Sequence, residues 1–252
     1  VLGVAAWSAG GNLVTGNIAM GSAGTQTAGL SAGGFNGTIN FTQTEEYNGS
    51  GWSLGGAMNT ARRYPGSTGT QTAALVFGGF PPALTTTESY NGSSWTTVNS
   101  MGTARYQIGG AGIQTAALAF AGNIFPGTTT ATESYNGSSW TSVNSMNTSR
   151  DTLAGRGTQT SALGYGGGTP TPSTATESYD GTSWATTANL GTARYGLGGA
   201  GADSTSSLAF GGGPPAGLTN TEEFGLTIYS PIAATWASGG ALNTGRDNML
   251  VF

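Results

Sequence analysis

The chain has 252 residues and a net charge of −4, with charged side chains at only 7% of positions, hydrophobic residues at 37% and 46 glycines. These values are typical of a turn-rich all-β protein with a packed core. The sequence contains no His, Cys or Lys, so imidazole and thiolate metal sites, Schiff bases, the usual catalytic triads and disulfides are excluded. We therefore expect no enzyme activity, no cofactor and no metal.

Composition also argues against two classes of partner. The basic residues are all Arg and form no cluster, whereas a nucleic-acid surface needs basic groups gathered along the phosphates. No run approaches the ~20 apolar residues of a membrane-spanning helix. We expect neither nucleic-acid binding nor membrane insertion.

Six tryptophans set the period of an internal repeat. They stand 45, 43, 45, 44 and 52 residues apart, at Trp7, Trp52, Trp95, Trp140, Trp184 and Trp236. A recurring unit of this length with glycine punctuation predicts a repeat fold of short strands.

Four strands are predicted in each repeat, in a constant order. The first follows an arginine, as in 105–110, and the second is an apolar run such as 72–77 that ends in a Gly-Gly pair. The third covers 86–90, and Asn91-Gly92 then forms a hairpin turn into the fourth at Trp95, because Asn and Gly tolerate positive φ. We expect repeats at 16–52, 60–95, 103–140, 148–184 and 192–224, with 1–15 as a closing strand and 225–252 as an irregular C-terminal extension.

Such a unit cannot bury both faces alone, so the copies must stack. Radial stacking of four-stranded antiparallel blades gives an all-β propeller as one domain over 1–252. Five blades are favoured, with the strand of Trp7 completing the blade that ends at Phe224, so that both termini contribute to one sheet. The alternative is a six-bladed ring, for which six copies of ~45 residues need about 270 residues.

The repeat resembles a known family. The Gly-Gly after the second strand, the aromatic residue in the third and the Trp in the fourth resemble the kelch repeat of β-propellers, over nearly the whole chain. The Ser/Thr/Gly-rich variant, as in "TESYNGSSWTTVNSMGTARY", is similar to kelch-like repeats of environmental bacteriophage virion proteins. The first resemblance implies a disc with a central channel, and the second implies a structural or adhesive role on a virion.

A Glu and an Arg recur at fixed places in the repeat. Each Glu stands two residues before the aromatic residue of the third strand, and each Arg ten residues after a Trp. They are Glu45, Glu88, Glu133, Glu177 and Glu222, and Arg62, Arg105, Arg150, Arg194 and Arg246. The i and i+2 side chains of a strand share a face, so each Glu lies on the side of its core aromatic and needs an Arg partner. We expect buried structural Glu–Arg pairs; the alternative is a charged ring lining the channel.

The candidate binding residues lie in the loops between second and third strands, which vary while the repeat stays constant. They are Phe35, Asn36, Phe80, Pro81, Asn123, Phe125, Pro170, Pro172, Pro214 and Pro215. Loops on a rigid scaffold usually carry binding. The repeated Trp and Tyr residues are interpreted as packing between blades rather than as platforms for sugar rings.

We therefore predict a non-enzymatic module located on a virion or otherwise outside the cell. Its expected partners are other virion proteins or a host-surface glycan or receptor, with assembly or homo-oligomer formation through 225–252. The alternatives are a secreted carbohydrate-binding lectin or adhesin, and an intracellular kelch-type interaction scaffold. Exposed aromatics facing polar groups in five equivalent pockets would favour the lectin.

Overall fold

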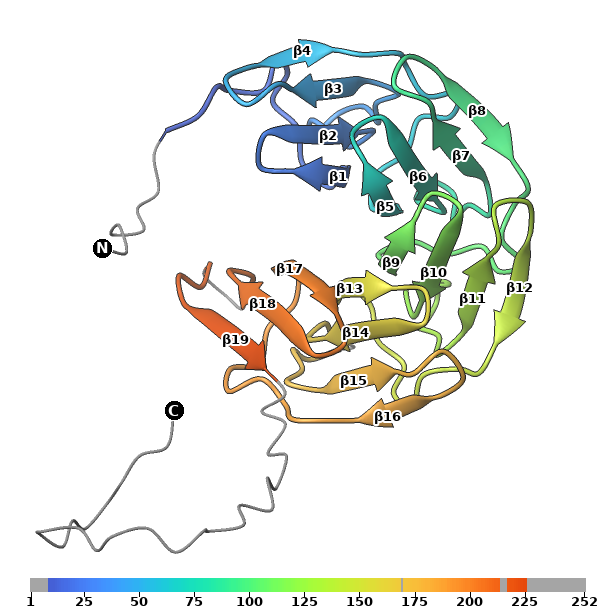
Figure 1. The fold of residues 1–252 in the computed structure, drawn as a ribbon, viewed down its shortest axis with the longest axis vertical. Helices are drawn as coiled ribbons and strands as arrows, with labels where there is room; N and C mark the ends of the chain where they lie inside the picture. The colour runs from blue at the N-terminus through green and yellow to red at the C-terminus, as the bar shows by residue number, and fades with distance from the viewer. Residues whose placement is uncertain (1–8, 169, 214–216, 226–252) are drawn as a thin grey trace, which may run out of the picture.

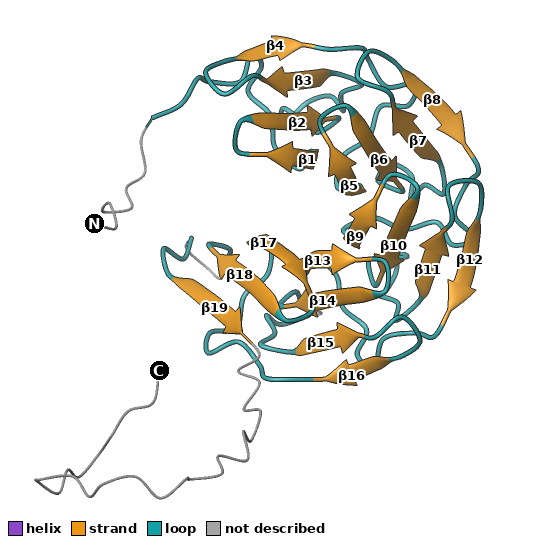
Figure 2. Ribbon diagram, viewed as in Figure 1, coloured by secondary structure: helices purple, strands orange, loops and turns teal. Residues whose placement is uncertain are grey.

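The structure, a computed structural model, is a five-bladed β-propeller, and it describes residues 9–168, 170–213 and 217–225 (Figure 1). The described part contains strands and loops and no helix (Figure 2). Each blade is one antiparallel sheet whose strands follow chain order from the channel to the outer edge. The prediction of an all-β, five-bladed propeller is confirmed.

Four blades have four strands each in the described residues, and the fifth has three. Blade one contains β1 (Gly21–Thr25), β2 (Ala28–Ala32), β3 (Thr44–Tyr47) and β4 (Trp52–Leu54), and blade two contains β5 (Gly66–Thr70), β6 (Ala73–Phe77), β7 (Thr87–Tyr90) and β8 (Trp95–Val98). Blade three contains β9 (Gly109–Ile113), β10 (Ala116–Phe120), β11 (Thr132–Tyr135) and β12 (Trp140–Val143), and blade four contains β13 (Ala154–Thr158), β14 (Ser161–Tyr165), β15 (Thr176–Tyr179) and β16 (Trp184–Thr186). Blade five contains β17 (Gly198–Asp203), β18 (Ser206–Phe210) and β19 (Thr221–Gly225).

The expected closing strand over 1–15 is only partly covered by the described residues. Trp7 lies outside them, and so does the expected extension over 225–252 apart from Gly225, which is the last residue of β19. Residues 9–15 form no strand; they run along blade one, where a Cβ on Gly10 would lie 3.1 Å from the Tyr47 hydroxyl oxygen. The described part of this segment is therefore not part of a sheet.

The first strand of each blade begins later than predicted. In blade three the prediction was 105–110, whereas β9 begins at Gly109. Gln107 has a φ of 55°, a left-handed conformation that ends any extended segment from Arg105. The chain thus turns beside the channel before β9 starts.

Glycines form much of the inner strands because neighbouring groups approach the backbone closely. A Cβ on Gly109 would lie 2.4 Å from Cε2 of Phe120, on the paired strand β10. Phe120 is fully buried in the core, so its ring has no room to move away. This close approach explains the Gly-rich fragments that precede each apolar strand.

Replacing Gly109 by Ala is expected to lower the free energy of unfolding by about 1–3 kcal/mol through overpacking. Gly51→Ala is the matched control, since a Cβ there meets nothing within 4 Å. Urea denaturation followed by circular dichroism compares the two variants. Equal stabilities would contradict the proposed role of the close approach.

The hairpins between third and fourth strands use asparagine differently from the prediction. Only the glycine of the pair has positive φ, as at Gly92 with 90°. Asn91 instead accepts hydrogen bonds through its side-chain oxygen from the N–H groups of Ser93 and Ser94, at 3.0 and 2.9 Å. This is an Asx-type turn, and it explains why Asp180 can replace Asn in blade four, where the same backbone bonds lower its pKa.

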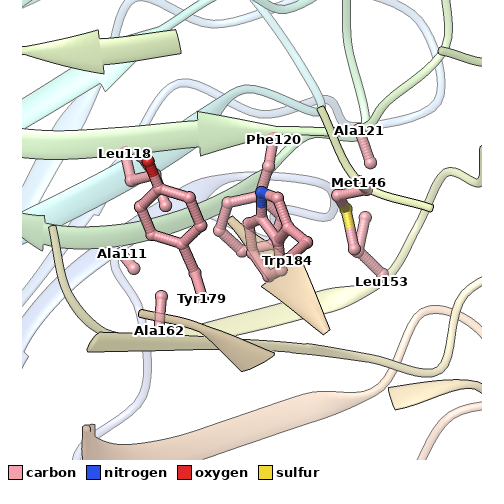
Figure 3. Packing of buried hydrophobic residues seen from close by; sticks show 9 residues of the cluster. All are labelled: Ala111, Leu118, Phe120, Ala121, Met146, Leu153, Ala162, Tyr179 and Trp184. Carbon is pink, nitrogen blue, oxygen red and sulfur yellow. The ribbon is translucent and has the colours of Figure 1, made fainter. Parts of the chain in front are cut away.

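The hydrophobic core lies between adjacent blades. One cluster joins Leu118, Phe120 and Ala121 of blade three to Tyr179 and Trp184 of blade four. Figure 3 shows the indole of Trp184 beside the Phe120 ring, with Met146 and Leu153 next to it. Each blade thus buries one face against the blade before it.

Candidate binding face

Within the described residues the recurring Glu and Arg side chains are buried, except that of Glu222, which is 24% exposed. Four ion pairs span 2.6–3.2 Å between guanidinium nitrogen and carboxylate oxygen: Arg62–Glu88, Arg105–Glu133, Arg150–Glu177 and Arg194–Glu222. All four arginines are buried. Burial lowers the pKa of Arg105, and the attraction of Glu133 opposes that shift. We call each of these pairs an Arg–Glu clamp.

Each clamp fixes the base of a variable loop. Arg105 Nη1 donates to the carbonyls of Ala121 and Ala131, at the start and end of the loop between β10 and β11, at 2.9 and 2.6 Å. Glu133 accepts from the N–H of Gly102 at 2.6 Å, on the connection from the preceding blade. The clamps therefore anchor both the loops and the joints between blades.

In blade one a neutral side chain replaces the arginine of the clamp, and the glutamate remains. Asn17 occupies the place of the arginine and donates to the Gly33 carbonyl at 2.6 Å. Glu45 is buried and accepts from the Gln43 amide at 2.7 Å and from the N–H groups of Val14 and Thr15. Arg246, the remaining predicted member, lies outside the described residues.

The central channel is lined by small side chains from all five inner strands. It holds a cavity of about 360 Å³, and among the described residues that line it Arg156 alone is charged. Arg156 donates from Nε to the Gly199 carbonyl at 2.6 Å. Within the described residues the clamps do not form a charged ring around this cavity, so the alternative interpretation of the recurring charges is wrong for these four pairs.

The tryptophans of the fourth strands serve in packing. Trp95 and Trp184 are buried, and their rings lie 4.8 and 5.1 Å from those of Tyr90 and Tyr179. Burial, reinforced by a hydrogen bond to Glu46 of blade one, raises the pKa of Tyr90 to about 12. These aromatic residues join blades and are not open platforms.

The variable positions gather on one face of the disc. In an antiparallel blade, the loops between second and third strands and the connections between blades leave the sheet at the same end. There, five pairs of residues are joined by isolated β-bridges: Ile18–Phe35, Arg63–Phe80, Tyr106–Asn123, Asp151–Gly168 and Tyr195–Gly213. We call them the rim pairs. The first residue of each pair directly follows the buried Arg, or Asn17 in blade one, and the second directly follows the Gly-Gly or Ala-Gly of its blade.

A chain of backbone hydrogen bonds holds the rim together. The residue after each of the first rim residues has positive φ. In blades two to five its N–H donates to the carbonyl of the equivalent residue one blade earlier, as from Tyr64 to Ala19 at 2.7 Å and from Gln107 to Tyr64 at 2.8 Å. The rim is therefore a rigid support for residue pairs whose combination differs in every blade.

Side chains on this face form a continuous strip across blades one to four. The Arg63 guanidinium lies over the rings of Phe35 and Phe80, at 4.3 and 5.1 Å from their centroids. The Phe80 ring is 4.9 Å from that of Tyr106. Burial, and secondly the carboxylate of Asp151, raises the pKa of Tyr106. We call Phe35, Arg63, Phe80, Tyr106, Asn123 and Asp151 the rim strip.

The strip ends in a hollow on the same face. Asn123 donates to the Asp151 carboxylate at 3.0 Å. Beside it lies a cavity of about 310 Å³ lined by Gln107, Asp151, Thr152, Gly168, Pro170 and Tyr195. Aromatic faces, a cation, an amide and a carboxylate are groups that bind polar ring compounds or protein loops.

Comparison of the chain with models of protein families and with curated proteins finds no match. Among the described residues no group of three or more acidic, His or Cys side chains is placed to hold a metal. In the same part of the chain no helix is long and apolar enough to cross a membrane.

The predicted loop residues fall into three groups. Phe35, Phe80 and Asn123 belong to the rim strip, whereas Asn36, Pro81, Phe125, Pro170 and Pro172 lie in the loops beside it, with Phe125 77% exposed. Pro214 and Pro215 lie outside the described residues. Sequence reasoning missed Arg63, Tyr106, Asp151 and Tyr195. Their signal was available, since each follows a constant Arg and the position holds three different residue types in these four repeats.

Proposed function

We propose that the protein is a non-enzymatic kelch-type propeller, displayed on a bacteriophage virion, which binds the host surface through the rim strip. One observation carries this proposal: side chains that vary between repeats converge on one face, whereas the constant residues are buried in clamps and in packing between blades. The sequence resemblance supports the virion setting. Interfaces are enriched in aromatic residues and Arg, and the rim strip has both.

The differences between rim pairs favour this proposal over a lectin with repeated sites. A propeller lectin of that kind would present similar aromatic and polar groups in each blade. Here the equivalent positions hold Ile18, Arg63, Tyr106, Asp151 and Tyr195. Five equivalent pockets are therefore not expected on the described part of this face.

A glycan array and immobilised host-envelope preparations test the binding role. We expect wild-type protein to bind one ligand class, and Arg63→Ala and Phe80→Ala each to weaken binding at least about tenfold, as central Arg and aromatic contacts do. Leu54→Ala is the control, because Leu54 is exposed but lies on the outer strand β4. Unchanged binding in both rim variants would contradict the proposed face.

The virion setting is tested separately. Antibodies against the propeller should label intact particles, and capsid, portal or tail genes should flank its gene. Particles without label in a genome without such neighbours would refute the setting, while leaving the binding face to its own test.

A further inference from the structure

Arg63 differs from the arginines of the clamps in what its N–H groups meet. Arg105 donates four hydrogen bonds, to three backbone carbonyls and to Glu133. Arg63 donates one, from Nη1 to the side-chain oxygen of Asn40 at 3.4 Å, which is long for an N–H···O hydrogen bond. None of the ion pairs found among the described residues includes Arg63. Most of the five N–H donors of this guanidinium therefore have no protein acceptor in the described structure.

The unused donors of Arg63 are open to solvent. The residue is half-buried. In the described part of the chain, the buried side-chain atoms without a hydrogen-bond partner are Oγ1 of Thr86 and the Nε atoms of Arg105 and Arg150. Nε and Nη2 of Arg63 also lack a described partner but are not among these buried atoms. They are therefore accessible to an incoming group.

Two aromatic rings hold this guanidinium in place on the rim. Its central carbon lies 4.3 Å from the ring centroid of Phe35 and 5.1 Å from that of Phe80, within the range of cation–π attraction. Both rings belong to residues fixed at the backbone, since Phe80 is bridged to Arg63 and Phe35 to Ile18. Because the cation is already positioned, a ligand that binds it pays little of the usual cost of ordering a long side chain.

The chemistry of the Arg63 side chain selects an anion. A guanidinium stays charged at any physiological pH and offers its donors in a planar fork that matches the oxygens of a carboxylate or phosphate. The same pairing occurs inside the protein, where Arg62 binds Glu88 at 2.6 Å. Arg63 is the next residue in the chain and carries an equal charge, but no acid among the described residues forms an ion pair with it. The free donors and the free charge thus point to an anionic group supplied by a ligand.

The rest of the rim strip suits the uncharged part of a sugar. The rings of Phe80 and Tyr106, 4.9 Å apart, offer apolar faces for a sugar ring. Beyond them, Asn123 and Asp151 carry amide and carboxylate oxygens, which accept hydrogen bonds from hydroxyl groups. Asp151 is the acid of the strip, and it repels a second anionic group placed beside it. The strip therefore fits a ligand whose single anionic group lies at the Arg63 end.

We propose that the rim strip binds a sugar residue that carries one anionic group, a carboxylate or a phosphate, with this group paired to the Arg63 guanidinium and the sugar ring packed on Phe80 and Tyr106. This inference rests on the proposed binding of a host surface and names the chemical class of the ligand. The anionic group can come from an acidic sugar or from a sugar phosphate, and the experiment below separates these two sources.

Arg156 supplies the matched control. It is the other arginine without an acid partner among the described residues, and it lies in the channel, where Nε and Nη1 donate to the carbonyls of Gly199 and Gly155 at 2.6 and 2.8 Å. The described residues that line the channel cavity include no aromatic side chain. An anion attracted by net charge alone would respond equally to the loss of either arginine, whereas a ligand of the rim responds only to Arg63.

Titration of the full chain with three small sugars, followed by NMR, tests the proposal. The probes are methyl β-D-glucuronide, glucose 6-phosphate and the neutral methyl β-D-glucoside, which differs from the glucuronide in lacking the carboxylate. We expect one or both acidic probes to bind at least about tenfold more tightly than the neutral one, because a hydrogen bond to a charged group is lost without the anion. Binding should shift the Nε–H resonance of Arg63 and the amide resonance of Tyr106. Preference for the glucuronide or for the phosphate identifies the source of the anionic group.

Variants then assign the binding to one arginine. Arg63→Gln should weaken binding of the acidic probe at least about tenfold, to the level of the neutral sugar, whereas Arg156→Gln should leave it unchanged. Circular dichroism checks that both variants are folded. If Arg63→Gln is not, Arg63→Lys takes its place, and it should still weaken binding because an ammonium lacks the planar fork. Equal binding of acidic and neutral probes, full binding by the Arg63 variant, or an equal loss in Arg156→Gln would overturn the proposal.

Competition with host-envelope preparations separates this inference from the proposed function. We expect the acidic probe that binds best to displace wild-type protein from the envelope. If the envelope is bound through Phe80 but no acidic probe competes, the binding face stands and the anionic ligand class is wrong. If an acidic probe binds at Arg63 but no envelope is bound, the anion site stands and the host-surface role is wrong.

Discussion

Replacing Arg105 by Asn is expected to lower the free energy of unfolding by about 3–5 kcal/mol, because it leaves Glu133 buried without its cation. Both side chains are almost completely removed from solvent, at 0% and 2% exposed. Arg105 also donates to the carbonyls that define the loop base. Chemical denaturation measures the loss, and Arg63→Ala, which removes a half-buried Arg without an acid partner among the described residues, is the control.

Blade one supplies a rescue for this variant. Asn17 and Gln43 replace the clamp there, and Ala131 is the repeat equivalent of Gln43. Adding Ala131→Gln to Arg105→Asn should recover at least about 1 kcal/mol, since a hydrogen bond to a charged group contributes about 1.5–3 kcal/mol. A double variant no more stable than the single one would show that the arrangement does not transfer between blades.

Replacing Trp184 by Ala is expected to cost about 3–5 kcal/mol, the range for deleting a large aromatic side chain from a core. The indole packs against Phe120 and Tyr179 and is 6% exposed. Far-UV circular dichroism during denaturation avoids the loss of the fluorescent probe itself.

Thr132→Val separates the two contributions of that tryptophan. It removes only the acceptor of the indole N–H and should cost about 1–3 kcal/mol, because the donor is left buried without a partner. If Thr132→Val were as destabilising as Trp184→Ala, the hydrogen bond of Trp184 rather than its packing would account for most of its contribution to stability.

The repeat made the architecture predictable from sequence. The Trp spacing, the Gly-Gly pairs and the hairpin turns predicted the blades and their number, because each signal recurs in every repeat and marks the same strand or turn there. The predicted start of the first strand was wrong. The left-handed conformation at Gln107 depends on hydrogen bonds between blades, which cannot be read from the local sequence.

The candidate site was less predictable than the fold. The loop residues Phe35 and Phe80 were found because they interrupt a pattern, but Arg63 stands next to the constant Arg62 and was not separated from it. Only the structure shows that neighbouring residues have opposite roles: Arg62 is buried in a clamp, whereas Arg63 lies over two rings on the rim. Adjacent residues of an extended chain point to opposite sides. This alternation places Arg62 in the interior and Arg63 on the rim.

The rim pairs have a consequence for how this face can diversify. Each pair is joined by two reciprocal bonds between backbone groups, as between Arg63 and Phe80 at 3.0 and 2.9 Å, so side-chain identity is not needed to hold the bridge. Side chains at these ten positions can therefore change while the backbone bridges stay in place, although contacts such as that of Arg63 over Phe35 join adjacent blades. If the rim binds a host surface as proposed, point substitutions alone would give it new recognition specificities, in the way that antibody loops change on a constant framework.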